Sequence, residues 1–348
     1  METRILTVSH LDPDPDAIGE AANLLRTGRL VAFPTETVYG LGANALDAGA
    51  VAAIYEAKGR PARNPLIVHV HGAEQARGLS ADWPARADLL ARAFWPGPLT
   101  LVVARAPFIP DIVTAGGATV ALRVPAAPVA LALLRAADVP VAAPSANRSN
   151  RVSPTRAAHV LRHLGGRIPL ILDGGPTPGG IESTVLDVTG PTPRLLRPGL
   201  VTRAQLEEVV GPVDGPAAPA PTDPERTDAP LASPGMMRKH YAPHAPLELA
   251  EPARAAARVA AILAEDAAAR VGWLRIGCDA PGGGEPRLTL HPMPDTPRAY
   301  AVRLYDALHA MDDAGVTRIV ADAPPRTPDW HAVNDRLGRA ASSQNHPE

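Results

Sequence analysis

The sequence predicts a two-domain α/β protein, and three observations carry that prediction. Between residues 14 and 210, short apolar runs that end in polar or glycine-rich segments alternate with stretches of helical periodicity. Residues 211–234 then repeat Pro and Ala without apolar periodicity, which is typical of a linker. From Leu247 onward, strand and helix patterns alternate again. We therefore expect a first domain over residues 1–210, a linker over 211–246 and a smaller α/β domain over 247–348.

Composition limits the class of protein. The chain of 348 residues has a net charge of -2, which argues against a large basic surface for nucleic acid, so any RNA contact is expected to be local or indirect. No apolar run approaches the roughly 20 residues that a membrane span needs. The single cysteine, Cys278, excludes an internal disulfide, and the start METRILTVSH lacks a signal-peptide pattern. We expect a cytoplasmic enzyme without a membrane partner.

The elements of the first domain follow from apolar periodicity and helix caps. Gly28 lies just past the end of the first helix, and Thr202 with Gln205 forms a capping box before the last one. Helices are expected at 14–27, 48–57, 85–93, 128–137, 154–164 and 202–210. Strands are expected at 30–33, 66–70, 99–103, 119–124, 139–143, 168–172, 185–188 and 194–197. The segment after Pro34, with Gly40 and Gly42, is predicted to be a loop that carries a site.

Three cations lie between the helix at 48–57 and the apolar run at 66–70, namely Lys58, Arg60 and Arg63. Taken alone, this pattern also fits a solvated helix end, where cations favour the negative end of the helix dipole. The segment from Thr35 to Thr37 likewise fits a turn whose hydroxyls bond the local backbone. Similar polar segments recur after other strands, and this repetition favours a binding site.

Arg123 lies inside the otherwise apolar run VALRVP. Burial of an unpaired guanidinium is costly, so a buried arginine usually meets a carboxylate or a phosphate. The partner of Arg123 is therefore either an Asp or Glu of the chain or an anionic ligand.

Polar side chains follow at least five of the predicted strands in the first domain. These polar segments at strand ends are Thr35, 58–64, Arg123, 145–147 and 183–197. Cations and hydroxyls occur at most of them, whereas carboxylates in metal-cluster spacing do not. If these polar segments lie close together in the fold, the pocket that they form suits a nucleotide phosphate together with a small carboxylate-bearing substrate.

Two further patterns argue against other kinds of site. His159 and His163 are spaced i, i+4 on a predicted helix, but no acidic or cysteine partner accompanies them. We expect them to be surface residues, and we expect no direct protein ligand for a metal. In the second domain, the glycines at 282–284 precede no helix, which argues against a dinucleotide site.

The second domain is predicted to have three layers and a largely parallel sheet. Its strands are expected at 247–249, 271–276, 288–290 and 318–321, and its helices at 253–269, 297–314 and 328–341, the last two capped by Thr296 and Thr327. The linker ends in the motif SPGMMRKHYAP. This motif either docks on a neighbouring domain or forms a lid that brings Tyr241 and Arg238 over a pocket.

Nine short sequence motifs, taken in order, resemble those of a known family. They are FPTETVYGLG, KGRPARNPLIVHV, PGPLTLV, ALRVP, PSANRS, SPT, DGG followed by ESTV, LRPG and KHYAP. Together they resemble the threonylcarbamoyl-AMP synthase family in its two-domain form. The resemblance implies a YrdC-like catalytic domain with a twisted mixed sheet, a KHYAP lid segment in the linker and a trailing Rossmann-like α/β domain. Asn150 stands where the family commonly has glycine, and asparagine is the next best residue for a left-handed backbone.

The resemblance also implies an activity and a set of site residues. The activity is that of a nucleotidyltransferase, which joins L-threonine, bicarbonate and ATP into threonylcarbamoyl-AMP and releases pyrophosphate. A separate transferase then uses the product for threonylcarbamoyladenosine modification of tRNA next to the anticodon. Threonine contacts would be Thr35, His69, Arg123, Ala143 and Ser183. ATP contacts would be Lys58, Arg60, Asn64, Thr119, Ser145, Asn147, Ser153, Arg197 and Tyr241.

Catalysis is expected to depend on positioning and on neutralisation of phosphate charge, because no residue is an obvious covalent nucleophile. Lys58 and Arg60 are the catalytic candidates, and Mg²⁺ is the cofactor expected to accompany ATP. A closed Tyr241 lid would exclude water from the carbamate and the adenylate.

Two other functions compete with this one. A carbamoyl-transfer protein of hydrogenase maturation uses the same core, but such chains carry zinc-finger cysteines and an acylphosphatase-like segment, which this sequence lacks. A plain RNA-binding module is disfavoured by the net charge of -2.

Overall fold

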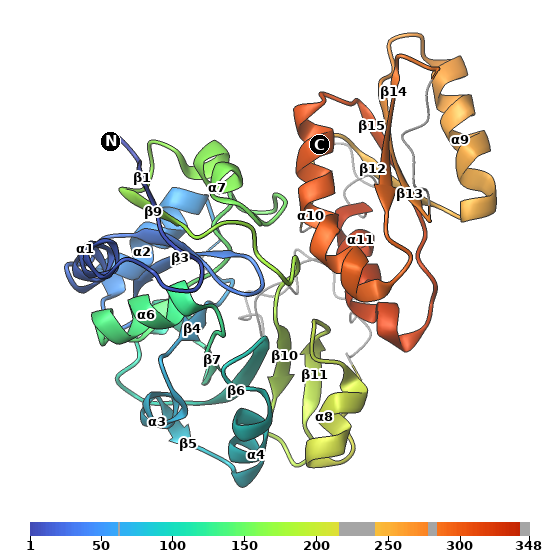
Figure 1. Cartoon of the computed structure of the whole chain (residues 1–348). Helices are drawn as coiled ribbons and strands as arrows, with labels where there is room; N and C mark the ends of the chain where they lie inside the picture. The colour runs from blue at the N-terminus through green and yellow to red at the C-terminus, as the bar shows by residue number, and fades with distance from the viewer. Residues whose placement is uncertain (62, 216–240, 278–283, 342–348) are drawn as a thin grey trace. The chain divides into compact units, whose positions relative to one another are not determined.

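The structure, a computed structural model, describes residues 1–61, 63–215, 241–277 and 284–341 (Figure 1). The chain divides into two compact units. The first comprises Met1–Ser149, Pro154–Pro178 and Glu182–Met236, and the second comprises Asn150–Ser153, Gly179–Ile181 and Met237–Glu348. The second unit is therefore discontinuous in sequence, because two short segments from the middle of the chain belong to it.

The first unit is built on a mixed sheet, as predicted. The strand order is β1-β9-β2-β3-β8-β4-β7-β6-β10-β11, and β5 pairs with β6. Parallel pairs such as β4 with β7 and β6 with β10 occur beside antiparallel pairs such as β4 with β8 and β6 with β7. The strands are β1 Arg4–Thr7, β2 Val31–Pro34, β3 Tyr39–Asn44, β4 Ile67–His69, β5 Ser80–Asp82, β6 Leu99–Arg105, β7 Thr119–Arg123, β8 Val141–Ala142, β9 Leu170–Asp173, β10 Thr184–Asp187 and β11 Arg194–Arg197.

Helices cover both faces of this sheet, and each face has its own apolar core. The helices are α1 Pro15–Arg26, α2 Ala48–Lys58, α3 Ala73–Gly78, α4 Ala85–Phe94, α5 Asp111–Thr114, α6 Pro128–Ala137, α7 Ala157–Leu164 and α8 Arg203–Val210. Strand β2 shows why two cores form: Val31 and Phe33 join the core under α1 and α6, whereas Ala32 joins the core under α2 and α7. Alternate side chains of a strand point to opposite faces, so a strand buried on both faces reads as a continuous apolar run.

The segment after Pro34 differs from its prediction as a loop. Only the four residues that follow Pro34 form a turn, and β3 then pairs antiparallel with β2, with Val31 opposite Gly42. A Cβ atom at Gly42 would lie 2.8 Å from the Phe33 ring and 2.8 Å from Val141 Cγ1. Glycine at position 42 is therefore needed for close packing within a strand, which the sequence pattern alone does not distinguish from a loop.

Several local predictions for the first unit have clear outcomes. The capping box of Thr202 with Gln205 is confirmed at the start of α8. Helix α7 begins later than predicted, at Ala157, and its cap residue is Arg156. Strands β1 and β5 and helix α3 were not predicted, because β1 is largely exposed and β5 and α3 are short and polar.

The second unit has the three layers and the parallel sheet that the sequence predicts. Its sheet order is β12-β15-β13-β14, and every pair is parallel. The elements are β12 Leu247–Ala250, α9 Pro252–Glu265, β13 Val271–Ile276, β14 Leu288–Met293, α10 Pro297–Asp313, β15 Arg318–Asp322, a 3₁₀ helix Pro328–Trp330 and α11 His331–Ala341. Val271 and Trp273 pack under α9, whereas Gly272 faces Met311 of α10 on the other side of the sheet.

Two remaining predictions concern the second unit. Asn150 has φ 64°, so its predicted left-handed backbone is confirmed. Thr296 occupies the N-cap position of α10, but its side chain makes no capping hydrogen bond.

The linker segment 216–240 and the glycines Gly282 and Gly283 lie outside the described residues. Within the described ranges, no helix combines the length and the hydropathy that a membrane crossing requires.

The packing around Gly199 gives a test of this fold. A Cβ atom there would lie 2.4 Å from the backbone nitrogen of Thr184, which cannot move without shifting β10. Gly199→Ala is therefore expected to lower the free energy of unfolding by about 1–3 kcal/mol or more, measured by urea denaturation. Gly190→Ala is the matched control, because its nearest neighbour would be 3.7 Å away. Equal stability of the two variants would contradict the packing described for β10.

Candidate active site

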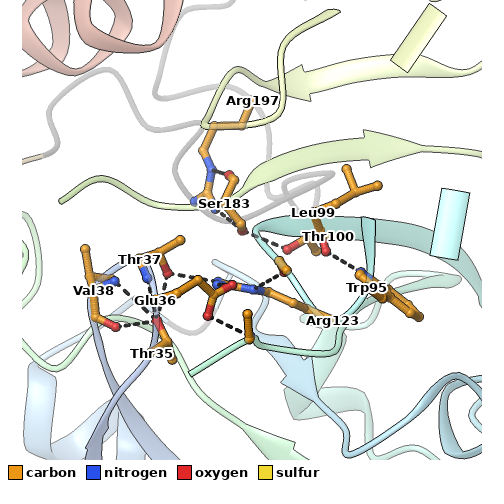
Figure 2. A network of polar contacts seen from close by, with 12 residues as sticks. Thr35, Glu36, Thr37, Val38, Trp95, Leu99, Thr100, Arg123, Ser183 and Arg197 are labelled. Atoms are coloured by element: carbon orange, nitrogen blue, oxygen red, sulfur yellow. Dashed lines mark hydrogen bonds and ion pairs between the residues drawn. The ribbon is translucent and has the colours of Figure 1, made fainter. Parts of the chain in front are cut away.

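Arg123 lies at the last position of β7, and its side chain is buried. Its guanidinium donates from Nε to Gly97 O at 3.2 Å, from Nη1 to Thr37 Oγ1 at 3.0 Å and from Nη2 to Glu36 Oε1 at 2.5 Å (Figure 2). Glu36 Oε2 in turn accepts from the backbone nitrogen of Ala126 at 3.0 Å. The chain itself therefore supplies the carboxylate that a buried arginine requires.

The turn between β2 and β3 holds two of these acceptors in place. The Thr35 hydroxyl donates to Val38 O at 2.7 Å and accepts from the backbone nitrogens of Thr37 and Val38 at 3.2 and 3.3 Å. The hydroxyls of Thr35 and Thr37 are 2.8 Å apart. Because the Thr35 proton goes to Val38 O, Thr37 donates to Thr35 and keeps its lone pairs for Arg123. The Thr35 hydroxyl therefore bonds the local backbone, whereas the Thr37 hydroxyl also contacts the buried cation.

His69 ends β4 and is the register partner of Arg123 on β7. It is buried, and the Phe33 ring meets it edge-on with the ring centroids 6.4 Å apart. Burial, and then the positive charge of Arg123, lowers the pKa of His69 to about 3. Among the described residues, none hydrogen-bonds His69 Nδ1. The imidazole is therefore neutral at physiological pH.

Ser183 comes just before β10 and belongs to a second group of polar contacts. Its hydroxyl is 2.8 Å from Thr100 Oγ1, and Arg197 donates to it from Nη2 at 3.1 Å and to its carbonyl from Nε at 3.0 Å. Strand β6 pairs with β7 on one side and with β10 on the other. The Ser183 group therefore lies on the β6 side of Arg123, with Thr100 on the neighbouring strand β6 and the other residues on or next to β10 and β11 (Figure 2).

Lys58 ends α2, and its side chain is buried. Its ammonium donates to Ser145 O at 2.5 Å and to Asn147 O. Burial, and then the nearby charge of Arg60, holds the pKa of Lys58 well below its usual value. The interpretation of Lys58 as part of a solvated helix end is therefore wrong, because a solvated lysine is neither buried nor bonded to two carbonyls.

Arg60 is also buried and donates to the carbonyls of Asn64 and Pro65, at 3.2 and 2.9 Å. Asn64 is fully buried beside it. The solvated interpretation fits only the third cation, Arg63, which is exposed.

Strand directions bring three of the predicted ATP residues, Ser145, Asn147 and Thr119, to one end of β4. Strand β8 is antiparallel to β4, so Ser145 and Asn147, which follow β8, reach the start of β4 next to Lys58. Ala143 lies between, with its nitrogen donating to Ile67 O at 2.9 Å. Thr119 opens β7 at the same end, because β7 is parallel to β4.

The two groups of site residues therefore flank the short strand β4. The Lys58 group lies where β4 starts, and the Arg123 group lies where β4 ends. Because β4 has only three residues, these ends are about 7 Å apart along the strand. A single elongated ligand could contact both groups.

Two of the predicted ATP contacts lie in the second unit. Ser153 O is 3.2 Å from His309 Nε2. Tyr241 is buried, stacks on Tyr305 with centroids 5.6 Å apart, and has the Arg336 guanidinium 5.3 Å from its ring centroid. The other lid residues, 238–240, lie outside the described residues.

The predicted surface position of His159 is wrong. His159 is buried, and its Nδ1 is 3.3 Å from the backbone nitrogen of Thr155. The amphipathic helix α7 turns His159 and Val160 inward with Leu164. In the part of the chain that the structure describes, no group of three His, Cys, Asp or Glu residues could hold a metal ion.

Sequence reasoning placed Glu36 and Thr37 in the segment expected to carry a site but assigned neither of them a role, and it missed Thr100. The sequence did contain an indication for Glu36, because a buried Arg123 needs an acidic partner and Glu36 lies in the polar segment that follows β2. Nothing in the sequence distinguished Thr100 from an ordinary strand residue.

Comparison with known proteins identifies the family. A family model described as "Telomere recombination" matches residues 23–199, and one described as "Threonylcarbamoyl-AMP synthase, C-terminal domain" matches 201–342. Threonylcarbamoyl-AMP synthase of Bacillus subtilis is 44% identical over 95% of this chain and 94% of its own length. The chain belongs to the two-domain threonylcarbamoyl-AMP synthase family. The enzyme of this name from Pyrococcus abyssi is 42% identical over 92% of this chain and 93% of its own length.

A solved structure supports membership of the synthase family. The crystal structure of P. abyssi Sua5 complexed with L-threonine is 40% identical, covers 97% of this chain and 98% of its own, and superposes with a TM-score of 0.88. The fold predicted for both domains is thereby confirmed.

The buried His69 gives a pH-dependent prediction. Unfolded imidazole takes up a proton near its ordinary pKa of 6.5, whereas folded His69 does so only near 3. Between these values the unfolded state binds more protons, so stability is full above this window and falls as the pH falls. From pH 7 to pH 5, His69 is expected to remove about 2 kcal/mol from the free energy of unfolding.

The measurement is urea denaturation at both pH values. His69→Gln should lose less stability on acidification than the unaltered chain, whereas the exposed control His10→Gln should follow it. Identical pH dependence for His69→Gln and the unaltered chain would show that His69 is not buried as a neutral group.

Proposed function

We propose that this member of the synthase family condenses L-threonine, bicarbonate and ATP into threonylcarbamoyl-AMP and pyrophosphate. The observation that carries the proposal is the placement of a buried lysine group and a buried arginine group at opposite ends of β4, a strand about 7 Å long. The lysine group suits phosphates, and the arginine group suits a small carboxylate. The structure of a 40% identical relative with L-threonine supports the second assignment.

The threonine site is proposed to comprise Thr35, His69, Arg123, Ala143 and Ser183. Arg123 has donors for the substrate carboxylate, and the neutral His69 ring offers a hydrogen bond without adding charge. The fixed hydroxyls of this region are suited to polar contacts with the threonine side chain.

The part of the ATP site in the first unit is proposed to comprise Lys58, Arg60, Asn64, Thr119, Ser145, Asn147 and Arg197. Buried donors face less competition from water, so Lys58 and Arg60 are suited to phosphate oxygens. Mg²⁺ is proposed to arrive with ATP, because the Lys58 group offers cations and carbonyls but no cluster of carboxylates among the described residues. Bound to the triphosphate, it would neutralise charge on the departing pyrophosphate.

The chemical task is attack of a carbamate oxygen on the α-phosphorus of ATP, with pyrophosphate as the leaving group. The carbamate is a weak nucleophile, so the contribution proposed for the protein is to hold the two reactants in line and to stabilise charge on the phosphate oxygens. Lys58 is held by two carbonyls and Arg60 by two more, so both cations are positioned before a substrate binds.

The product is proposed to pass to a separate transferase that modifies tRNA next to the anticodon. We place the reaction in the cytoplasm, where ATP and tRNA occur together. The net charge of -2 supports an indirect or weak contact of this chain with tRNA itself.

Pyrophosphate release tests the proposed reaction. The full-length protein with MgATP should release pyrophosphate only when both L-threonine and bicarbonate are present, and serine should support less release. Removal of Mg²⁺ with EDTA should stop it. Release that does not depend on threonine would contradict the proposed reaction and leave the fold unaffected.

Lys58 is expected to matter for both rate and stability. Lys58→Ala should lower pyrophosphate release by about 100-fold or more, because a donor to the phosphates is lost. It should also lower the free energy of unfolding by about 2 kcal/mol, since the carbonyls of Ser145 and Asn147 lose their donor. Lys58→Arg keeps charge and donors and should retain more activity. Arg63→Ala is the control, because Arg63 is exposed on the same segment. Near-normal release by Lys58→Ala would remove Lys58 from the mechanism.

A further inference from the structure

Glu36 is a largely buried carboxylate with no role among the predicted site residues. It lies in the turn between β2 and β3, and its side chain is 13% exposed. One oxygen accepts from Arg123 Nη2 and the other from the backbone nitrogen of Ala126 (Figure 2). An ionised carboxylate has about four acceptor positions. The contacts described here use two, so Glu36 retains acceptor capacity beside Arg123.

Arg123 also retains hydrogen-bonding capacity. A guanidinium carries five N–H donors, and the protein acceptors Gly97 O, Thr37 Oγ1 and Glu36 Oε1 use three of them. Two donors can serve one further carboxylate. A substrate carboxylate can therefore bind Arg123 while Glu36 stays in place.

The charge balance of this arrangement determines which carboxylates fit. Glu36 already neutralises Arg123, and the two side chains are only 13% and 4% exposed. A second carboxylate would add negative charge next to Glu36 in a poorly solvated place, which is unfavourable. Neutral His69 does not offset that charge. A ligand that carries its own positive charge next to its carboxylate does offset it.

An α-amino acid is such a ligand, because one carbon atom separates its ammonium group from its carboxylate. We propose that Glu36 is the subsite for the substrate's amino group, so that Arg123 holds the carboxylate and Glu36 holds the amine of one zwitterion. The proposal rests on the proposed function, because it takes L-threonine as the substrate. Glu36 then selects amino acids over other carboxylates and fixes the nitrogen that becomes carbamoylated.

Two other roles for Glu36 predict different results. If Glu36 only holds Arg123 in position, its loss weakens every carboxylate ligand alike. If Glu36 occupies the position of the substrate carboxylate, its loss strengthens every carboxylate ligand alike. If it binds the amine, its loss weakens amino acids and strengthens carboxylates that lack an amine.

Calorimetric titration of the full chain in bicarbonate-depleted buffer distinguishes these roles. The ligands are L-threonine and its analogue with a hydroxyl in place of the amino group. The unaltered chain should bind threonine about tenfold or more tightly than the analogue, since an amine bonded to a carboxylate is a charge-assisted hydrogen bond. Glu36→Gln should bind threonine about tenfold more weakly and the analogue no more weakly than before, so that the preference disappears.

Two further variants keep this test decisive. Glu36→Asp keeps the charge and should keep the preference for threonine, even if Glu36→Gln folds poorly. Glu20→Gln is the matched control, because Glu20 pairs with Arg4 at the surface of the same unit and should leave both affinities unchanged.

Three results would overturn the assignment of Glu36. Equal weakening of both ligands in Glu36→Gln would mean that Glu36 only positions Arg123, and equal strengthening would mean that it competes with the substrate carboxylate. Failure of the unaltered chain to bind L-threonine would overturn the proposed substrate and the assignment of Glu36 with it. Intact threonine binding with an unchanged preference in both Glu36 variants would overturn the Glu36 assignment alone.

Discussion

Burial of the Arg123 guanidinium is the constraint on which the architecture of the site depends. A cation taken out of water must be paired and its donors must be satisfied, or folding becomes unfavourable. Arg123 meets this condition with contacts from two separate segments, the turn after β2, which supplies Glu36 and Thr37, and the loop before β6, which supplies Gly97. Segments that are distant in sequence are thereby held at fixed positions around one charged group, and the same positions define the binding site.

The buried lysine at the other end of β4 is handled in a different way. Lys58 has two backbone carbonyls as its described partners, and burial together with Arg60 disfavours its charged form. An arriving anion would relieve that penalty, whereas Arg123 is already neutralised by Glu36. The two ends of β4 therefore differ in charge before any ligand binds, one being prepared for a polyanion and the other for a group of little net charge.

Much of the fold could be predicted from the sequence, because strands buried on both faces appear as continuous apolar runs. The bounds of α6, β11 and β13 match the predicted ranges. The pattern failed where it was weak: β3 contains two glycines, of which Gly42 is required by close packing, and β1 is an exposed edge strand.

The site was predictable only in part. The need of Arg123 for an anionic partner follows from its apolar neighbours, but the identity of that partner does not, because Glu36 lies 87 residues away in sequence. The burial of Lys58 was equally hidden. It depends on the antiparallel pairing of β8 with β4, which places two backbone carbonyls next to the end of α2. That strand pairing cannot be predicted from the local sequence.

The discontinuity of the second unit has an evolutionary consequence. Family models divide the chain near residue 200, yet Asn150–Ser153 and Gly179–Ile181 belong to the unit that lies mostly after that point. A Cβ atom at Gly180 would lie 2.2 Å from Ala301 O on α10, so a substitution there is restricted by a helix encoded far downstream. The two halves of the gene therefore cannot diverge independently, and a chimera joined at the linker would combine segments of the second unit that had never been selected together.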